Sequence, residues 1–177
     1  MELEFKPVVA GDIDRLRPFY GLRPNKTCDS VFLDSFLWKD YYHVQCAVSE
    51  GRAVLWLMEK DGQVSTAMPL CREEDLPYFF QQMVDYFSGV LHKPFYISLA
   101  DEEAVQCLNL DPALFEVEEQ VDLKDYLYSG EELRKLEGKK FVKKRNHLNG
   151  FKRTYEGRYE YRRLCCSDRH EVWQFME

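Results

Sequence analysis

The apolar pattern of the first 128 residues predicts a mixed α/β (α+β) domain. Three short apolar runs follow one another, separated by the dipeptides Glu50-Gly51 and Asp61-Gly62, and the second dipeptide is typical of a hairpin turn. Residues 72–91 repeat apolar side chains every three or four positions, as an amphipathic helix does. The expected elements, in order, are strand 3–9, a helix after Gly11-Asp12, a helix capped by Asp29 or Ser30, strands 43–48, 53–59 and 64–70, helix 72–91, strand 94–99, helix 101–108 and strand 115–127.

A helical pattern follows over residues 131–154, which Gly138 could interrupt. One side of the helical wheel is apolar, with Leu133, Leu136, Phe141, Leu148, Phe151 and Tyr155. The other side carries Lys139, Lys143, Asn146, Asn149 and Arg153. Residues 158–164 then read as a strand, and Ser167-Asp168 would cap a final helix.

Two ten-residue stretches echo one another. LEFKPVVAGD at residues 3–12 and YEYRRLCCSD at residues 159–168 share an order of residue types with a constant offset of 156. Each ends at a site that can cap a helix. The echo predicts a tandem repeat, with one whole domain and the beginning of a second.

Charge is segregated along the chain. The net charge is −7, from 24 basic and 31 acidic residues. Seven of the bases lie between Lys139 and Arg153, with no acid among them, so the rest of the chain has 17 bases against 31 acids, or −14. Such a segment is typical either of a phosphate or nucleic-acid contact or of the solvated face of a helix.

Other kinds of chemistry have little support in the sequence. The four histidines are scattered, no C-x-x-C pair occurs, and no metal site is expected. The six cysteines read as the reduced thiols of a cytoplasmic protein: Cys28, Cys46, Cys71, Cys107, Cys165 and Cys166. No leader opens the chain, and the longest unbroken apolar run, residues 53–58, is too short for a transmembrane segment.

The basic segment supplies the candidate site. Lysine and arginine neutralise phosphates, and asparagine side chains could fix a phosphate, a ribose or a base edge. The candidate phosphate-binding residues are Lys139, Lys140, Lys143, Lys144, Arg145, Asn146 and Asn149. Asp125 and Tyr126 lie just before the helix and are possible ligand contacts at a domain junction, although the end of a packed strand is the alternative.

The same stretch resembles the phosphatidylglycerol lysyltransferase C-terminal domain family, in its small soluble bacterial members. The resemblance is carried by D-Y-L-Y-S at residues 125–129, G-K-K at 138–140 and K-R-N-H-x-N-x-F at 144–151, with S-x-x-F-x-D-S-F-L-W-K near residues 29–39 as a looser match. It implies two GNAT-like acyltransferase domains, each a mixed sheet flanked by helices. The first would fill residues 1–128, a basic linker helix 129–156, and the start of the second 157–177.

The resemblance also implies a function, which is transfer of an aminoacyl group from charged tRNA to a lipid or another acceptor. The seven basic-segment residues match the family's basic motif and would contact tRNA or another phosphate-bearing ligand. No catalytic residue is assigned, and the oligomeric state, contact with a membrane surface and catalytic activity itself stay open.

Two alternatives remain. A CoA-dependent N-acyltransferase fits the implied fold, but the chain lacks the Q/R-x-x-G-x-G/A loop that holds the CoA pyrophosphate, which disfavours acetyl-CoA as a cofactor. A non-catalytic binding or scaffold module would instead use the basic helix to dock an acidic partner or the chain's own acidic first domain.

Overall fold

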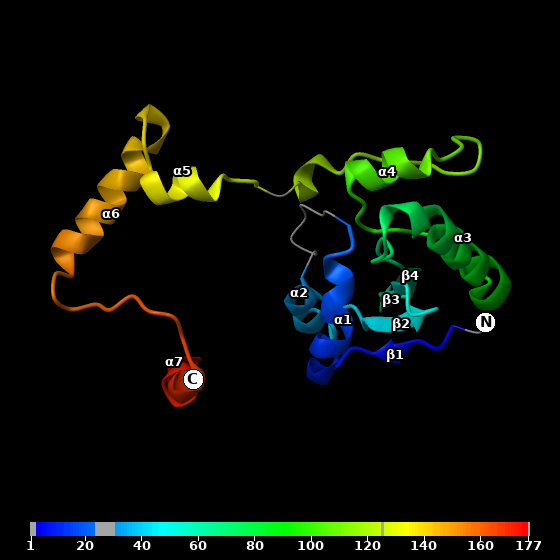
Figure 1. Ribbon diagram of the computed structural model, residues 1–177, viewed down its shortest axis with the longest axis horizontal. Helices are drawn as coiled ribbons and strands as arrows, with labels where there is room; N and C mark the ends of the chain where they lie inside the picture. Colours follow the sequence, from blue (N-terminus) through cyan, green and yellow to red (C-terminus); the bar gives the residue numbers. More distant parts are fainter. Residues whose placement is uncertain (1–2, 24–30, 125, 177) are drawn as a thin grey trace. The chain divides into compact units, whose positions relative to one another are not determined.

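The computed structural model describes residues 3–23, 31–124 and 126–176. The chain forms two compact units, Met1–Tyr126 and Leu127–Glu177. The first unit contains a four-stranded antiparallel sheet with the order β1-β2-β3-β4 (Figure 1). Its strands are β1 (Lys6–Pro7), β2 (Gln45–Ser49), β3 (Ala53–Lys60) and β4 (Gln63–Ser65).

Four helices accompany this sheet: α1 (Ile13–Tyr20), α2 (Phe32–Leu37), α3 (Leu76–Tyr86, continued by a π turn at Phe87–Leu91) and α4 (Glu102–Leu108). All four were expected from the sequence. The mixed α+β class is therefore confirmed, whereas the domain boundaries at residues 128 and 156 stay a prediction.

Strand β3 lies at the centre of the core because both of its faces are covered. Ala53 and Leu55 pack into one cluster with residues of α3 and α4. Val54 and Trp56 pack into a second cluster with residues of α1 and α2. Successive strand residues point to opposite faces, so the unbroken apolar run of β3 is the pattern of a strand buried on both sides.

Both glycine dipeptides form hairpin turns, and the hairpin expected at Asp61-Gly62 is confirmed. Glu50 and Gly51 have φ of 54° and 66°, and Asp61 and Gly62 have φ of 52° and 82°. Two successive positive φ angles define the tight turn whose twist matches the flanking strands. The turns fix the register, with Ser49 opposite Ala53 and Lys60 opposite Gln63.

The other three strand predictions are wrong or only partly realised. Residues 94–99 make a single parallel bridge, between Ile97 and Thr66. Neither 115–124 nor 158–164 forms a strand. Alternating apolar residues predict a half-buried strand only where a neighbouring strand accepts the backbone hydrogen bonds, and the described residues provide no such neighbour for these two segments.

The second unit is helical in its described residues, with α5 (Gly130–Lys135), α6 (Val142–Thr154) and α7 (Arg169–Met176). The helix expected over 131–154 is thus divided at Gly138, which has φ of 82°. The final helix was also expected.

The sequence echo has a counterpart in local geometry. The 3-10 turn Ala10–Asp12 precedes the eight-residue α1, and the turn Cys166–Asp168, 156 positions later, precedes the eight-residue α7. In the first turn the Asp12 carboxylate accepts the Val9 N–H at 2.9 Å. In the second, the Asp168 carboxylate accepts the Cys165 N–H at 2.7 Å. The two turns therefore use the same capping arrangement.

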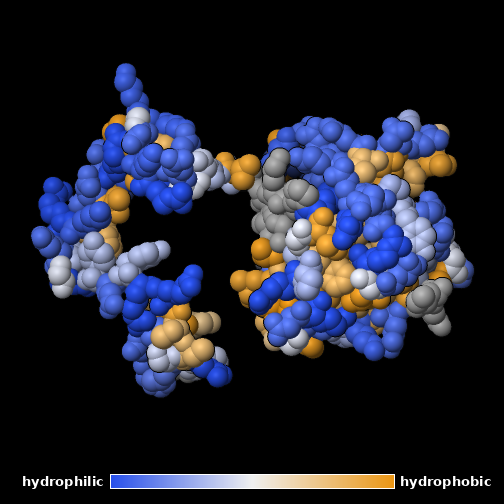
Figure 2. Space-filling model, in the orientation of Figure 1, coloured by the Kyte–Doolittle hydropathy of each residue, from blue (hydrophilic) through white to orange (hydrophobic). Residues whose placement is uncertain are grey.

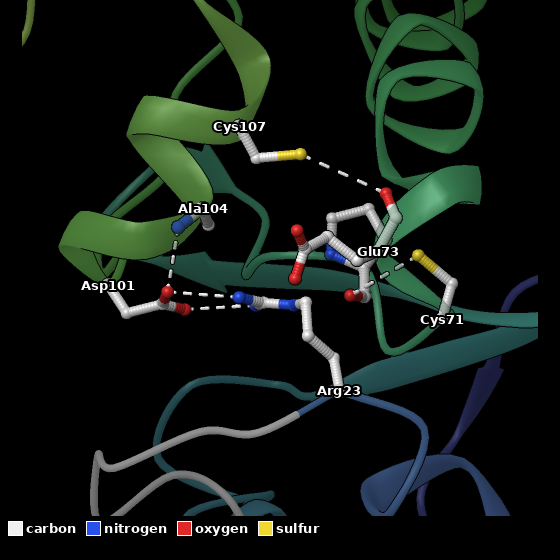
Figure 3. Close-up of polar contacts among 7 residues, drawn as sticks. Arg23, Cys71, Glu73, Asp101, Ala104 and Cys107 are labelled. Atoms are coloured by element: carbon white, nitrogen blue, oxygen red, sulfur yellow. Dashed lines mark hydrogen bonds and ion pairs between the residues drawn. The ribbon is translucent and has the colours of Figure 1, made fainter.

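A buried ion pair ties α4 to the segment that follows α1. The Arg23 guanidinium donates two hydrogen bonds of 2.9 Å to the two Asp101 oxygens, and both side chains are less than a tenth exposed (Figure 3). Asp101 also caps α4 by accepting the Ala104 N–H at 2.8 Å. Burial would raise the pKa of the Asp101 carboxyl, but these hydrogen bonds outweigh it and hold that pKa below its ordinary value.

We predict that Asp101→Ala lowers the free energy of unfolding of the first unit by about 3–5 kcal/mol, because it leaves a buried guanidinium without its carboxylate. Native-state hydrogen exchange of the β3 amides would measure this, since these amides exchange only when the unit opens. Glu102→Ala, one residue along in the exposed first turn of α4, is the matched control and should cost about 0.5 kcal/mol or less. Equal losses for both variants would contradict the prediction.

Candidate functional site

The predicted basic segment folds as a helical hairpin, which we call the basic hairpin (residues 130–154: α5, a turn and α6). Ser129 begins it by accepting the Glu132 N–H at 3.4 Å. Leu136 adopts a left-handed conformation that ends α5, and Phe141 is buried where α6 begins. Hydrophilic residues cover much of this hairpin (Figure 2).

Arg145 closes the hairpin. Its guanidinium donates to the carbonyl oxygens of Leu136 and Gly138, the latter at 2.9 Å. These carbonyls lie just beyond the end of α5, where a helix leaves backbone acceptors without partners. The predicted ligand residue Arg145 is thus engaged by the protein's own backbone and holds α6 to the turn that follows α5.

Lys140 is also engaged. Its ammonium lies 2.7 Å from a carboxylate oxygen of Glu132 on α5 and 5.1 Å from the centre of the Phe141 ring. Among the seven predicted residues, within the part of the chain that the structure describes, it alone makes an ion pair with a carboxylate. That pair lies on the surface, where such contacts contribute about 0–1 kcal/mol.

The remaining residues define an exposed polar face of α6. Lys143, Asn146, Asn149 and Arg153 are separated by three or four positions in one continuous helix, which places them along one side. Their side chains are exposed, and no described carboxylate pairs with Lys143 or Arg153. From Lys143 to Arg153 this face extends about 15 Å along the helix axis, and Lys139 lies exposed just before α6.

Lys144 lies elsewhere. It precedes Leu148 by four positions and Phe151 by seven, so it belongs to the apolar side of α6 rather than to the polar face. That side continues into aromatic contacts, with the Phe151 ring 4.9 Å from the rings of Tyr155 and Tyr159. The structure therefore brings together Lys143, Asn146 and Asn149, but not Lys144 or Arg145.

For Asp125 and Tyr126, the two predicted ligand contacts at the domain junction, the described residues show no contact with the polar face of α6. Asp125 lies outside the described residues. Tyr126 is the last residue of the first unit, and 88% of its surface is exposed. Their role as ligand contacts stays a prediction.

Sequence reasoning missed the cluster around Arg23 and Asp101. Cys71 and Cys107 lie nearby, and their thiols point to the carbonyls of Pro69 and Glu73 at 3.9 Å (Figure 3). Burial raises the pKa of the Cys71 thiol to about 11, so it is a thiol at neutral pH. The acidic start of helix 101–108 was visible in the sequence, but nothing in it indicated an arginine 78 positions away.

Within 3–23, 31–124 and 126–176, no three His, Cys, Asp or Glu side chains gather as metal ligands would. No described helix combines the length and the apolar character that crossing a membrane requires.

The whole fold is similar to one solved structure. This is the crystal structure of a conserved protein of unknown function from Bacteroides thetaiotaomicron, with a TM-score of 0.83 and 24% sequence identity. The match covers 99% of this chain and 58% of that one. A similarity at this identity shows a shared fold. A comparison with curated proteins found no match.

A family match is more specific. Residues 21–177 match the family described as phosphatidylglycerol lysyltransferase, C-terminal. The matched range includes the basic hairpin, α7 and most of the first unit. The chain therefore belongs to the phosphatidylglycerol lysyltransferase C-terminal family.

Proposed function

We propose that this chain belongs to an aminoacyltransferase-like protein in which the polar face of α6 contacts a phosphate-bearing ligand, with charged tRNA as the aminoacyl donor. Family membership supports aminoacyl transfer as the general type of reaction, without specifying the donor or the acceptor. The observation that carries the ligand contact is that Lys143 and Arg153 stand exposed, without a described carboxylate partner, beside Asn146 and Asn149.

The chemistry of this face suits a phosphate backbone. The two cations neutralise negative charge at long range, and the two carboxamides can donate to phosphate or ribose oxygens at short range. A helix that served only to solubilise the hairpin would gain more from residues of higher helix propensity than asparagine. The asparagines are therefore better explained by a ligand.

The reaction would be an acyl transfer. An amine or hydroxyl of the acceptor attacks the carbonyl of the aminoacyl ester, the ester bond to the terminal ribose breaks, and the ribose hydroxyl leaves with the proton. The part proposed for α6 is to hold the donor's phosphates and so orient the ester, which supplies proximity rather than proton transfer. A lipid headgroup is one possible acceptor, and no residue is assigned as the base.

A GNAT-like fold and a tandem repeat belong to the same proposal. The order of α1, α2, the three hairpin strands, α3 and the bridge between Thr66 and Ile97 supports the first. The matching capping turns before α1 and α7 support the second. A cytoplasmic location is supported by the free state of the five described cysteines.

A CoA-dependent activity has less support. The CoA pyrophosphate would need free N–H groups at the N-terminus of a helix. The turn before α3 instead carries Glu73, Glu74 and Asp75, and Pro77 lacks an N–H. Arg52 pairs with Asp75 and is therefore not free to bind an anion. The carboxylates of Glu73 and Glu74 would repel an anion at this helix start.

A scaffold role is the second alternative, in which the basic residues neutralise the chain's own acids. Within the second unit, the pairs Lys140–Glu132 and Lys135–Glu131, each 2.7 Å, follow this pattern. They involve α5 and the turn rather than the polar face of α6. The observed pairs therefore account for the engaged bases and leave the polar face to the ligand.

We predict that Lys143→Ala weakens binding of uncharged tRNA and makes it less dependent on salt. Losing one phosphate contact reduces the slope of log K against log salt by about 0.7–0.9, and Lys143→Ala/Arg153→Ala should reduce it by about twice that amount. Fluorescence anisotropy at several salt concentrations would measure both. Lys135→Ala removes a paired lysine from α5 and is the matched control, for which the slope should not change. If all four proteins gave one slope, α6 would not be the contact.

We predict that Arg145 acts through the hairpin and not through the ligand. Arg145→Gln removes the two bonds to the Leu136 and Gly138 carbonyls, so amides of α6 should exchange about tenfold faster or more. The salt slope of tRNA binding should keep its original value. The opposite result, a smaller slope with unchanged exchange, would make Arg145 a phosphate contact.

We predict that acetyl-CoA leaves the melting temperature unchanged. A ligand at a hundred times its Kd would stabilise the protein by about 2.7 kcal/mol, which a thermal scan detects easily. Uncharged tRNA, scanned in parallel at low salt, should raise the melting temperature. A clear shift with acetyl-CoA would favour the CoA-dependent alternative.

A further inference from the structure

The outer edge of β2 has a position without a strand partner. Strand β1 pairs only with Gln45 and Cys46. The Val8 N–H donates to the carbonyl of Val44, the residue just before β2, so the backbone groups of Val44 point toward the β1 side. Because these groups alternate along an antiparallel ladder, Cys46 and Val48 turn theirs toward β1. Val48 has no backbone partner there among the described residues.

A groove of about 530 Å3 opens at this edge. Leu3 and Glu4 line one part of it, and Cys46 to Ser49 of β2 line another. Lys6 of β1 and, at the start of α1, Asp12 and Arg15 complete it. Its volume lies within the range of small-ligand sites, about 300–1,000 Å3. Val48 lines this groove and is 37% exposed.

The two sides of the β2 edge differ in character. Cys46 faces the α1 side, where it packs in the second core cluster, and Val48 follows it on that face. Ser49 faces the α3 side, where its hydroxyl bonds to Gln82, and the apolar Leu3 packs against the α3 cluster. A strand added at this edge would therefore meet polar groups of α1 with one face and Leu3 with the other.

The α1 side presents a linked donor and acceptor. The Arg15 Nη2 donates to Asp12 at 2.7 Å and lies 3.7 Å from the Cys46 sulfur, while its Nη1 has no partner among the described residues. Burial would raise the pKa of Asp12, but the Val9 N–H and Arg15 hold it below its ordinary value, so Asp12 is a carboxylate. A carboxamide can both accept from Arg15 and donate to Asp12, whereas a carboxylate could accept from Arg15 but has no hydrogen to donate to Asp12.

We propose that this groove binds a short extended peptide, which pairs its backbone with Val48 as an added strand and places an asparagine or glutamine side chain against Arg15 and Asp12. The alternate side chains of the peptide are apolar and meet Leu3. Strand addition at an exposed edge is a recurrent mode of peptide recognition, in which backbone bonds give affinity and alternate side chains give specificity.

The experiment is a titration of the full chain with the peptide acetyl-Val-Gln-Val-Gln-amide, followed by 15N–1H NMR. The amides of Val48 and its strand neighbours should shift with a saturable dependence on peptide. Two control peptides carry backbone N-methyl groups, one on both valines and the other on both glutamines. Because only alternate residues of an added strand direct their N–H groups toward β2, only one of these two peptides loses the amides that pair with it. One of these peptides should bind about five- to tenfold more weakly, and the other about as well as the parent.

Two variants test the side-chain contact. Arg15→Gln should weaken binding by about fivefold or more and leave the Val48 resonance among the shifted ones. Arg17→Gln, on the exposed side of the same helix, is the matched control and should leave the affinity within about twofold.

Three results would overturn the proposal. These are no shift of Val48 at millimolar peptide, equal affinity for both methylated peptides and the parent, or Val48 shifts that depend on protein concentration alone. The last result would mean that the edge pairs with a second copy of this chain. None of these readouts involves tRNA, so the outcome is independent of the function proposed for α6.

Discussion

Burial of β3 on both faces is the constraint on which the first unit depends. A strand with Ala53, Val54, Leu55 and Trp56 in succession can bury all four only between two layers of helices. α3 and α4 must therefore cover one face and α1 and α2 the other. Since β3 takes the centre, β2 and its short partner β1 are left at the margin, where the chain exposes a backbone edge. The groove at Val48 is thus a consequence of how the core is filled.

Polar contacts then hold the layers in place. Arg23 and Asp101 connect the segment after α1 with the start of α4, and Asp101 also satisfies a free N–H of that helix. A bidentate pair with an additional backbone bond is the geometry in which a buried ion pair is best compensated. Because the two helices flank the sheet, this pair also stabilises the enclosure of β3.

The bases of the basic hairpin have different structural environments, although the sequence alone does not distinguish them. Arg145 offers five donors in a planar fork, which suits two carbonyl oxygens near the end of a helix. One arginine therefore fixes the turn between α5 and α6, and Lys143 and Arg153 are left exposed on α6.

The sequence predicted the features that depend on neighbouring residues. The glycine dipeptides determine hairpin turns through their own φ angles, and the apolar spacing of residues 72–91 determines one face of α3. The strands at 115–127 and 158–164 were predicted wrongly, because alternation describes one strand and says nothing about a neighbour to pair with. The Arg23–Asp101 pair, the role of Arg145 and the groove at Val48 depend on residues brought together by the fold. A single sequence gives no sign of such contacts.

The charge distribution indicates which ligand each surface can attract. Seven bases lie within residues 139–153, and the rest of the chain carries a net charge of −14. A field of this sign repels a polyanion from the acidic parts of the chain and leaves the polar face of α6 as the favourable point of approach. A neutral peptide experiences no such repulsion, so the groove beside Arg15 and Asp12 remains open to it. The two proposed interactions would respond differently to salt: a phosphate contact at α6 would weaken steeply, whereas backbone hydrogen bonds between neutral groups are not screened.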